Sequence, residues 1–140
     1  MRIAIGCDHT GPDMKRALIA SVLSGHEVID VGTDSTQAVD YPDIAHEVGH
    51  LVAEGKVERG ILICGTGIGM AMAAGKLPGI RAARCGDPYS AELSRRHNNA
   101  NILCMGARII GHDMARKVVE TWLVAPFEGG RHARRVGKIG

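Results

Sequence analysis

Short apolar segments alternate with longer segments of helical periodicity along this chain, and that alternation constrains its fold more than any other feature. A parallel strand buried on both faces has a continuous apolar sequence, and the helix that follows carries the chain back to start the next strand. Five runs are predicted as strands: residues 2–6, 27–31, 60–64, 80–85 and 101–106. Five segments are predicted as helices: residues 13–23, 41–54, 69–76, 88–97 and 113–123.

These elements predict an α/β protein with a doubly wound, five-stranded parallel sheet, in a single three-layer, Rossmann-like domain over residues 1–140. The expected strand order is 2-1-3-4-5. Strands one and three are then neighbours whose connections leave to opposite faces, so a crevice opens at their carboxyl ends. Asp8 and His9 follow strand one and Cys64 ends strand three. We therefore expect these three side chains to meet at the crevice.

Charge, hydropathy and cysteine usage exclude several classes of partner. The chain has 17 Lys and Arg against 15 Asp and Glu, a net charge of +2, which gives no broad basic field for nucleic acid. No apolar stretch reaches membrane-spanning length, and the first residues enter a strand directly. The four cysteines lack the close spacing of zinc sites. We expect reduced thiols in a cytoplasmic protein that binds neither nucleic acid nor membrane.

The third predicted strand ends in a thiol that is followed by a glycine loop, Gly60-Ile61-Leu62-Ile63-Cys64-Gly65-Thr66-Gly67-Ile68-Gly69. Glycines let backbone N–H groups approach a ligand closely, and the start of a helix attracts anions. A helix N-terminus also favours a thiolate. Taken alone, a cysteine is more often a small core side chain. Beside this loop, Cys64 becomes a candidate base or nucleophile next to an anion site.

Three better-known anion motifs do not fit the loop. A cysteine phosphatase of the C-x5-R type requires arginine where this chain has Met70. The dinucleotide fingerprint G-x-G-x-x-G requires a glycine at that same position, and no Walker Gly-Lys-Ser/Thr follows. The pattern by itself indicates only a general anion site.

Other candidate residues have purely structural explanations as well as functional ones. Asp8 and His9 suit a turn in which Asp8 or Thr10 caps the following helix. The segment His97-Asn98-Asn99 suits a helix C-terminus, since histidine complements the dipole and asparagine tolerates left-handed backbone. Arg131 and Arg135 share a helix face if residues 131–136 are helical. They then either bind one phosphate together or form a solvated basic tail.

Six motifs, taken in order, resemble those of ribose-5-phosphate isomerase B and its hexose-6-phosphate isomerase relatives. They are Gly6-Cys7-Asp8-His9, Asp40-Tyr41-Pro42, the run from Gly60 to Gly69, Pro88-Tyr89-Ser90-Ala91, Ser94-Arg95-Arg96-His97-Asn98 and Glu128-Gly129-Gly130-Arg131-His132. The resemblance implies interconversion of D-ribose 5-phosphate and D-ribulose 5-phosphate through a cis-enediolate, with no metal and no organic cofactor. Two alternatives stay open: isomerisation of a hexose 6-phosphate such as allose or galactose 6-phosphate, and non-catalytic binding of a phosphosugar.

The resemblance also implies roles for individual residues. Cys64 would be the base that moves a proton between C2 and C1, with Thr66 assisting transfer between the two oxygens. His97 with Asp8 would open the sugar ring. The substrate would be bound by His9, Tyr41, Gly65, Gly67, Ile68, Gly69, Asn98, Arg108, Arg131 and Arg135, with His9 and the last two arginines on the phosphate. Another branch of the family has a glutamate base at the position of Met70, so Cys64 with Met70 indicates the thiol branch.

The family resemblance further implies a homodimer or a dimer of dimers. In such assemblies His97, Asn98 and the C-terminal arginines reach the Cys64 loop of a partner. Relatives have a longer C-terminal helix than this sequence, which ends soon after Arg135. We therefore expect the phosphate to be bound less tightly here.

Overall fold

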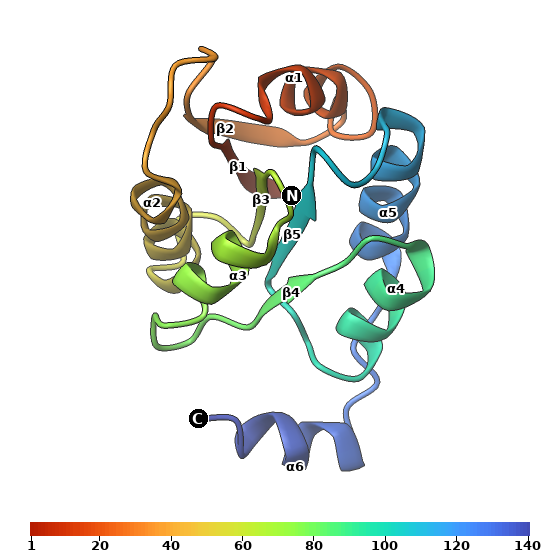
Figure 1. Ribbon diagram of the computed structural model, residues 1–140. Coiled ribbons are helices and arrows are strands. Elements are labelled where there is room, and N and C mark those ends of the chain that lie inside the picture. The colour runs from red at the N-terminus through yellow and green to blue at the C-terminus, as the bar shows by residue number, and fades with distance from the viewer.

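Five parallel strands form one sheet covered by helices on both faces, and the computed structural model describes all of residues 1–140 (Figure 1). The strands are β1 (Arg2–Cys7), β2 (Glu27–Gly32), β3 (Arg59–Cys64), β4 (Ala82–Arg84) and β5 (Ile102–Gly106). The helices are α1 (Pro12–Ala20), α2 (Tyr41–Ala53), α3 (Ile68–Ala74), α4 (Pro88–Arg96), α5 (His112–Val124) and α6 (Arg131–Gly137). The α/β class and every predicted element are confirmed, and α6 is an additional helix.

The sheet separates two apolar cores, because successive side chains of a strand point to opposite faces. Ile3 and Ile5 of β1 pack in the core that is covered by α1, α4 and α5. Ala4, which lies between them, packs in the core under α2 and α3. Figure 1 shows these two helix layers on either side of the sheet and shows α6 outside both. The buried interior thus has the three layers expected of a doubly wound fold.

The strand order is β2-β1-β3-β5-β4, so the predicted order 2-1-3-4-5 is wrong for the last two strands. All five residues of β5 are buried, as suits a strand with neighbours on both sides. By contrast, β4 has three residues, none of them buried, and ends in an exposed arginine, which suits the edge of a sheet. The parallel pairing of β1 with β3 is as predicted. The crevice at their carboxyl ends depends only on that pairing.

Local signals in the sequence set several helix ends. Pro12 occupies the first turn of α1, and Asp87 caps α4 by accepting the Ser90 N–H at 2.8 Å. Helix α1 ends at Ala20, three residues before the predicted end, and the following turn is closed by a hydrogen bond from the Leu23 N–H to the Leu18 carbonyl. None of the helices is both long enough and apolar enough to cross a bilayer.

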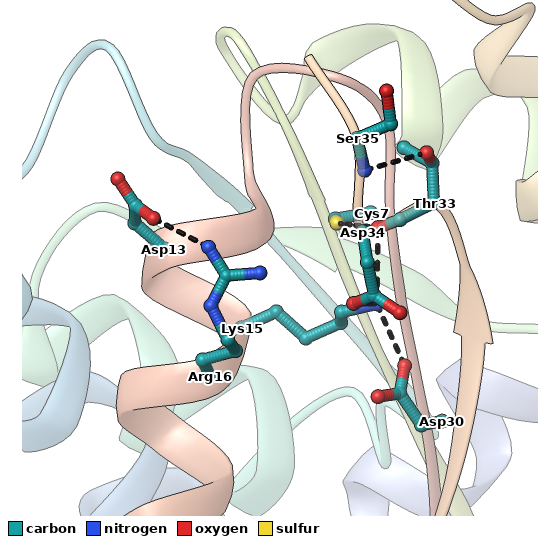
Figure 2. A network of polar contacts seen from close by, with 8 residues as sticks. All are labelled: Cys7, Asp13, Lys15, Arg16, Asp30, Thr33, Asp34 and Ser35. Carbon is teal, nitrogen blue, oxygen red and sulfur yellow. Dashed lines mark hydrogen bonds and ion pairs between the residues drawn. The ribbon is translucent and has the colours of Figure 1, made fainter. Parts of the chain in front are cut away.

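A buried lysine ties α1 to β2 and to the loop that follows it (Figure 2). Lys15 is fully buried, and its Nζ lies 2.7 Å from Asp30 and 3.1 Å from Asp34. The same ammonium donates a hydrogen bond to the Thr33 carbonyl at 3.1 Å. Burial lowers the pKa of Lys15, but its hydrogen bonds to Asp30 and Asp34 more than offset that effect and raise the pKa above 10.5. The lysine is therefore charged in the folded protein.

We expect Lys15→Met to lower the free energy of unfolding at pH 7 by about 1.5 to 3 kcal/mol, the usual contribution of hydrogen bonds to a charged group. Because the folded pKa lies above the unfolded one, this contribution is complete below pH 10.5 and is lost as the pH rises through the folded pKa. Urea unfolding from pH 7 to pH 11 measures both effects. Lys76→Met, at an exposed position in the turn after α3, is the control. Equal free energies of unfolding for Lys15→Met and Lys76→Met would show that the contacts of the Lys15 ammonium do not stabilise the fold.

Candidate active site

A cavity of about 430 Å³ opens at the carboxyl ends of β1 and β3. The loop after β1 and the start of α2 contribute Asp8 and Tyr41, and Cys64 lies at the end of β3. The rest of the lining comes from the glycine loop and α3: Gly65, Thr66, Ile68, Gly69 and Met72. The predicted crevice therefore exists, and it places Asp8 beside the thiol loop.

The glycine loop places one backbone N–H on the thiol and leaves two others without an acceptor. The Gly67 N–H donates a hydrogen bond to Cys64 Sγ at 3.1 Å. The N–H groups of Gly65 and Thr66 have no acceptor within the chain, so they are free to bind an anion. Gly67 has a φ of 82°, and a Cβ there would lie 2.8 Å from the Met105 carbonyl carbon. Only glycine fits this close approach between the loop and β5.

Neighbouring segments hold the loop in place from outside the cavity. Residues that follow β5 donate two backbone hydrogen bonds, from Ala107 to the Cys64 carbonyl at 2.8 Å and from Arg108 to the Gly65 carbonyl at 3.0 Å. The Arg84 Nε donates to the Thr66 carbonyl at 2.9 Å. These hydrogen bonds occupy the carbonyls of Cys64, Gly65 and Thr66, whereas the N–H groups of Gly65 and Thr66 stay unpaired.

The other three cysteines differ from Cys64 in environment. Burial raises the pKa of Cys7 to about 11, and it also raises the pKa values of Cys85 and Cys104. None of these three lines a cavity, and each stays a neutral thiol at neutral pH. Cys64 alone combines a cavity position with a backbone N–H donor at its sulfur. Cys64 is therefore the one cysteine that lies at the cavity.

Asp8 forms a turn and faces the cavity at the same time. Its Oδ1 accepts the Thr10 N–H at 2.9 Å and the Thr10 hydroxyl at 2.6 Å. Neither residue caps α1, whose N-cap is Gly11, so the capping interpretation is wrong. His9 does not line the cavity. Its Nδ1 accepts a hydrogen bond from the Val39 N–H at 3.3 Å. That bond leaves Nε2 with the proton in the neutral ring.

A second group of polar side chains lies between the end of α4 and α6, around a cavity of about 380 Å³. Its lining includes His97, Asn98, His132 and Arg135. His97 is the C-cap of α4, and Asn99 has a left-handed φ of 50°, so the predicted helix C-terminus is confirmed. Arg131 and Arg135 both lie on α6, so their spacing of four residues places them on one face of that helix.

Two histidine rings stack inside this second group. The His97 and His132 ring centroids are 4.2 Å apart with an interplanar angle of 5°. Glu128 Oε1 lies 3.5 Å from His132 Nε2 and 3.9 Å from His97 Nε2. Burial, then the neighbouring His97 and Arg131, lower the pKa of His132. His132 and Glu128 were assigned no role from the sequence, and helical spacing does not predict their contact because Glu128 lies before α6.

Comparison with known proteins decides the family. The family model described as Ribose/Galactose Isomerase matches residues 3–139. This chain belongs to the ribose/galactose isomerase family. Ribose-5-phosphate isomerase B of Escherichia coli (strain K12) is 50% identical over 139 residues, which cover 99% of this chain and 93% of that protein.

Other members of the ribose/galactose isomerase family agree over the whole length. D-erythrulose-4-phosphate isomerase of Pectobacterium atrosepticum is 45% identical, with 100% of this chain and 93% of that protein covered. The solved structure of ribose-5-phosphate isomerase B from Clostridium thermocellum is 55% identical, superimposes with a TM-score of 0.96, and covers 100% of this chain and 95% of that one. These matches confirm the Rossmann-like α/β fold.

Within a single chain of this protein, the candidate residues fall into two separate groups. No cavity is lined by both Cys64 and His97. Arg108 lies against the thiol loop, where its Nη1 is 3.6 Å from the position of a Cβ on Gly65. Arg131 lines neither cavity. The structure thus unites Asp8, Tyr41 and the thiol loop, and it leaves the His97 group elsewhere.

Proposed function

We propose that this chain is an aldose–ketose isomerase that interconverts D-ribose 5-phosphate and D-ribulose 5-phosphate through a cis-enediolate, with residues 1–140 forming one isomerase domain. The observation that carries the proposal is the Cys64 thiol at the cavity, with the Gly67 N–H on its sulfur and two free backbone N–H groups beside it. A base and an anion site in one cavity are what enediolate chemistry requires. The names of the relatives support the five-carbon substrate.

In the proposed reaction the Cys64 thiolate removes the proton from C2 of the open-chain aldose, and negative charge develops on the C1 oxygen. The free N–H groups of Gly65 and Thr66 would bind that oxygen, with Gly67, Ile68 and Gly69 completing the loop. The Thr66 hydroxyl accepts the Ile68 N–H at 3.2 Å, so its own proton is free to pass between the two substrate oxygens. Cys64 then delivers a proton to C1 to give the ketose, and in some turnovers the thiol proton exchanges with solvent before this delivery.

Ring opening and phosphate binding are assigned to the remaining candidate residues. We propose that His97, with Asp8, supplies acid and base at the ring oxygen, since that step needs a proton donor away from C2. The phosphate would be bound by the imidazole of His9 and by the guanidinium groups of Arg131 and Arg135, which suit a phosphate dianion. The rest of the substrate would contact Tyr41, Asn98 and Arg108.

The separation of Cys64 from His97 within one chain supports a site shared between two chains. We propose a homodimer, or a dimer of dimers, in which His97, Asn98 and the α6 arginines of one chain complete the Cys64 cavity of its partner. The four cysteines are all free thiols, which supports the further proposal of a cytoplasmic location.

Subunit mixing tests the shared site directly. We expect Cys64→Ala and His97→Asn to be inactive alone, whereas the two variants co-expressed recover about a quarter of wild-type activity. Half of a random population is heterodimer, and one of its two sites has both residues intact. Activity is measured with each variant carrying a different affinity tag so that the heterodimer can be isolated. Failure of the isolated heterodimer to regain activity would place Cys64 and His97 of the same site on one chain.

A second candidate substrate is the four-carbon D-erythrulose 4-phosphate, which the name of the Pectobacterium relative favours. We would compare kcat/KM for this sugar with values for ribose 5-phosphate, allose 6-phosphate and galactose 6-phosphate. We expect ribose 5-phosphate to be preferred by about tenfold or more, a usual effect of one carbon in a fitted pocket. A higher kcat/KM for another sugar phosphate would show that ribose 5-phosphate is not the preferred substrate. Binding of all four sugar phosphates without conversion would contradict the proposal that the protein is an isomerase.

A further inference from the structure

Three side chains with metal-binding atoms converge beside α6, away from the thiol loop. The imidazoles of His97 and His132 and the carboxylate of Glu128 each place a ligand atom within 4.8 Å of the other two. His97 ends α4, Glu128 lies in the connection after α5, and His132 lies in the first turn of α6. Residues from three different segments therefore form one compact donor set.

The separations are close to those of a coordination sphere. Four-coordinate zinc has bonds of about 2.0 to 2.1 Å, so neighbouring ligand atoms are about 3.3 Å apart. Glu128 Oε1 is 3.5 Å from His132 Nε2 and 3.9 Å from His97 Nε2. The two rings are stacked nearly parallel, so metal binding requires both rings to turn until their Nε2 lone pairs converge on the ion. Two imidazoles and one carboxylate are also a donor set that zinc uses where it keeps an open position for water.

Backbone hydrogen bonds fix the positions of the three residues that carry the ligand atoms. The Glu128 N–H donates to the Arg96 carbonyl at 3.0 Å, which fixes the connection against the end of α4. The His97 N–H donates to the Leu93 carbonyl at 2.9 Å, and the His132 N–H donates to the Gly129 carbonyl at 3.0 Å. His132 is 8% exposed, so metal binding would order few additional side-chain rotamers.

Neighbouring charges limit the affinity of this site. Arg96 Nη1 lies 3.9 Å from Glu128 Oε2, although Arg96 also pairs with Glu92 at 2.8 Å. Arg131 and Arg135 lie on α6 together with His132, and their positive charges repel a cation. We therefore expect affinity in the micromolar range, about 1 to 100 µM.

The geometry points to a reversible transition-metal site formed by His97, Glu128 and His132, which takes Zn²⁺ or a similar divalent ion. Occupation of the site binds the Nε2 of His97. Because His97 is the proposed ring-opening residue, the bound metal inhibits the isomerase. The inhibition rests on the proposed function, whereas metal binding does not.

Metal binding is tested on the full chain after treatment with a chelator. Isothermal titration with Zn²⁺ is expected to give one site per chain, and Co²⁺ to give the intense visible bands of a four-coordinate complex. His132→Gln and Glu128→Gln should each weaken binding by about tenfold or more, and His112→Gln, at an exposed histidine on α5, should not. The site is overturned if Zn²⁺ binds more weakly than about 1 mM, or if it binds His132→Gln as it binds wild type.

The inhibitory role has its own readout. We expect Zn²⁺ to lower the turnover of ribose 5-phosphate, EDTA to restore it, and whatever activity His132→Gln retains to be insensitive to the same Zn²⁺ concentration. If zinc binds and turnover is undiminished, the proposed inhibition is wrong but the proposed metal site is still supported. If the wild-type protein isomerises no sugar phosphate, the proposed function fails, and the titrations still decide whether the metal site exists.

Discussion

Replacement of Cys64 by alanine is expected to lower kcat for ribose 5-phosphate by about 10²- to 10⁴-fold, the usual contribution of a positioned acid or base. The side chain is small and lies at the edge of the core with 6% exposure, so its removal should change the fold little. KM should also change little, because the phosphate-binding groups lie elsewhere in the proposed site. Steady-state kinetics and urea unfolding of the same preparation separate the two effects.

The matched control for this variant is Cys85→Ala. Cys85 is similarly buried, at 3% exposure, but it lines no cavity, and burial raises its pKa so that it stays protonated. We expect nearly wild-type turnover from Cys85→Ala. Cys64→Ser, which keeps a hydroxyl in place of the thiol, should be as impaired as Cys64→Ala because an alcohol is a far weaker acid. Normal turnover in Cys64→Ala would rule out the thiol as the base.

Gly67→Ala is expected to destabilise the protein and to abolish most of its activity. At a φ of 82° an L side chain is strained, which usually amounts to about 1 to 3 kcal/mol. The added Cβ would also lie 2.8 Å from backbone carbon of Met105, which cannot move aside without shifting β5. Either response displaces the Gly67 N–H from Cys64 Sγ and alters the proposed anion site. Urea unfolding measures the first effect, and kcat/KM measures the second.

Gly55→Ala separates backbone strain from steric overlap. Gly55 has a similar φ of 73°, and a Cβ there meets nothing within 4 Å. We expect this variant to lose about 1 kcal/mol of stability and to keep its activity. If Gly67→Ala were no more damaging than Gly55→Ala, the close packing of the loop against β5 would not matter to the site.

The fold was largely predictable because each strand and helix has a local signal. Alternating apolar runs and helical segments predict all five βα units, and Asp87 with Pro88 marks the start of α4. The order of the last two strands was predicted wrongly because sequence order does not determine which strand is central. The relevant difference is that residues 102–106 are apolar or glycine throughout, whereas β4 is short and ends in Arg84.

The candidate site was predictable only where topology alone brings residues together. Asp8 and Cys64 follow neighbouring parallel strands, so their meeting follows from the β1 and β3 pairing. The grouping of His97 with His132 depends instead on where α6 docks against the end of α4, and no local pattern specifies that contact. The same holds for Lys15, whose burial follows from the carboxylates of the β2 region rather than from its own neighbours in sequence.

Solvent-isotope exchange tests most directly whether Cys64 moves the C2 proton of a sugar phosphate. Ribose 5-phosphate is incubated with the protein in D₂O and followed by ¹H NMR over many turnovers. We predict ribulose 5-phosphate with deuterium at C1, loss of the C2 proton signal from the remaining ribose 5-phosphate, and neither change with Cys64→Ala. Conversion and deuterium incorporation by Cys64→Ala at wild-type rates would contradict proton transfer by Cys64.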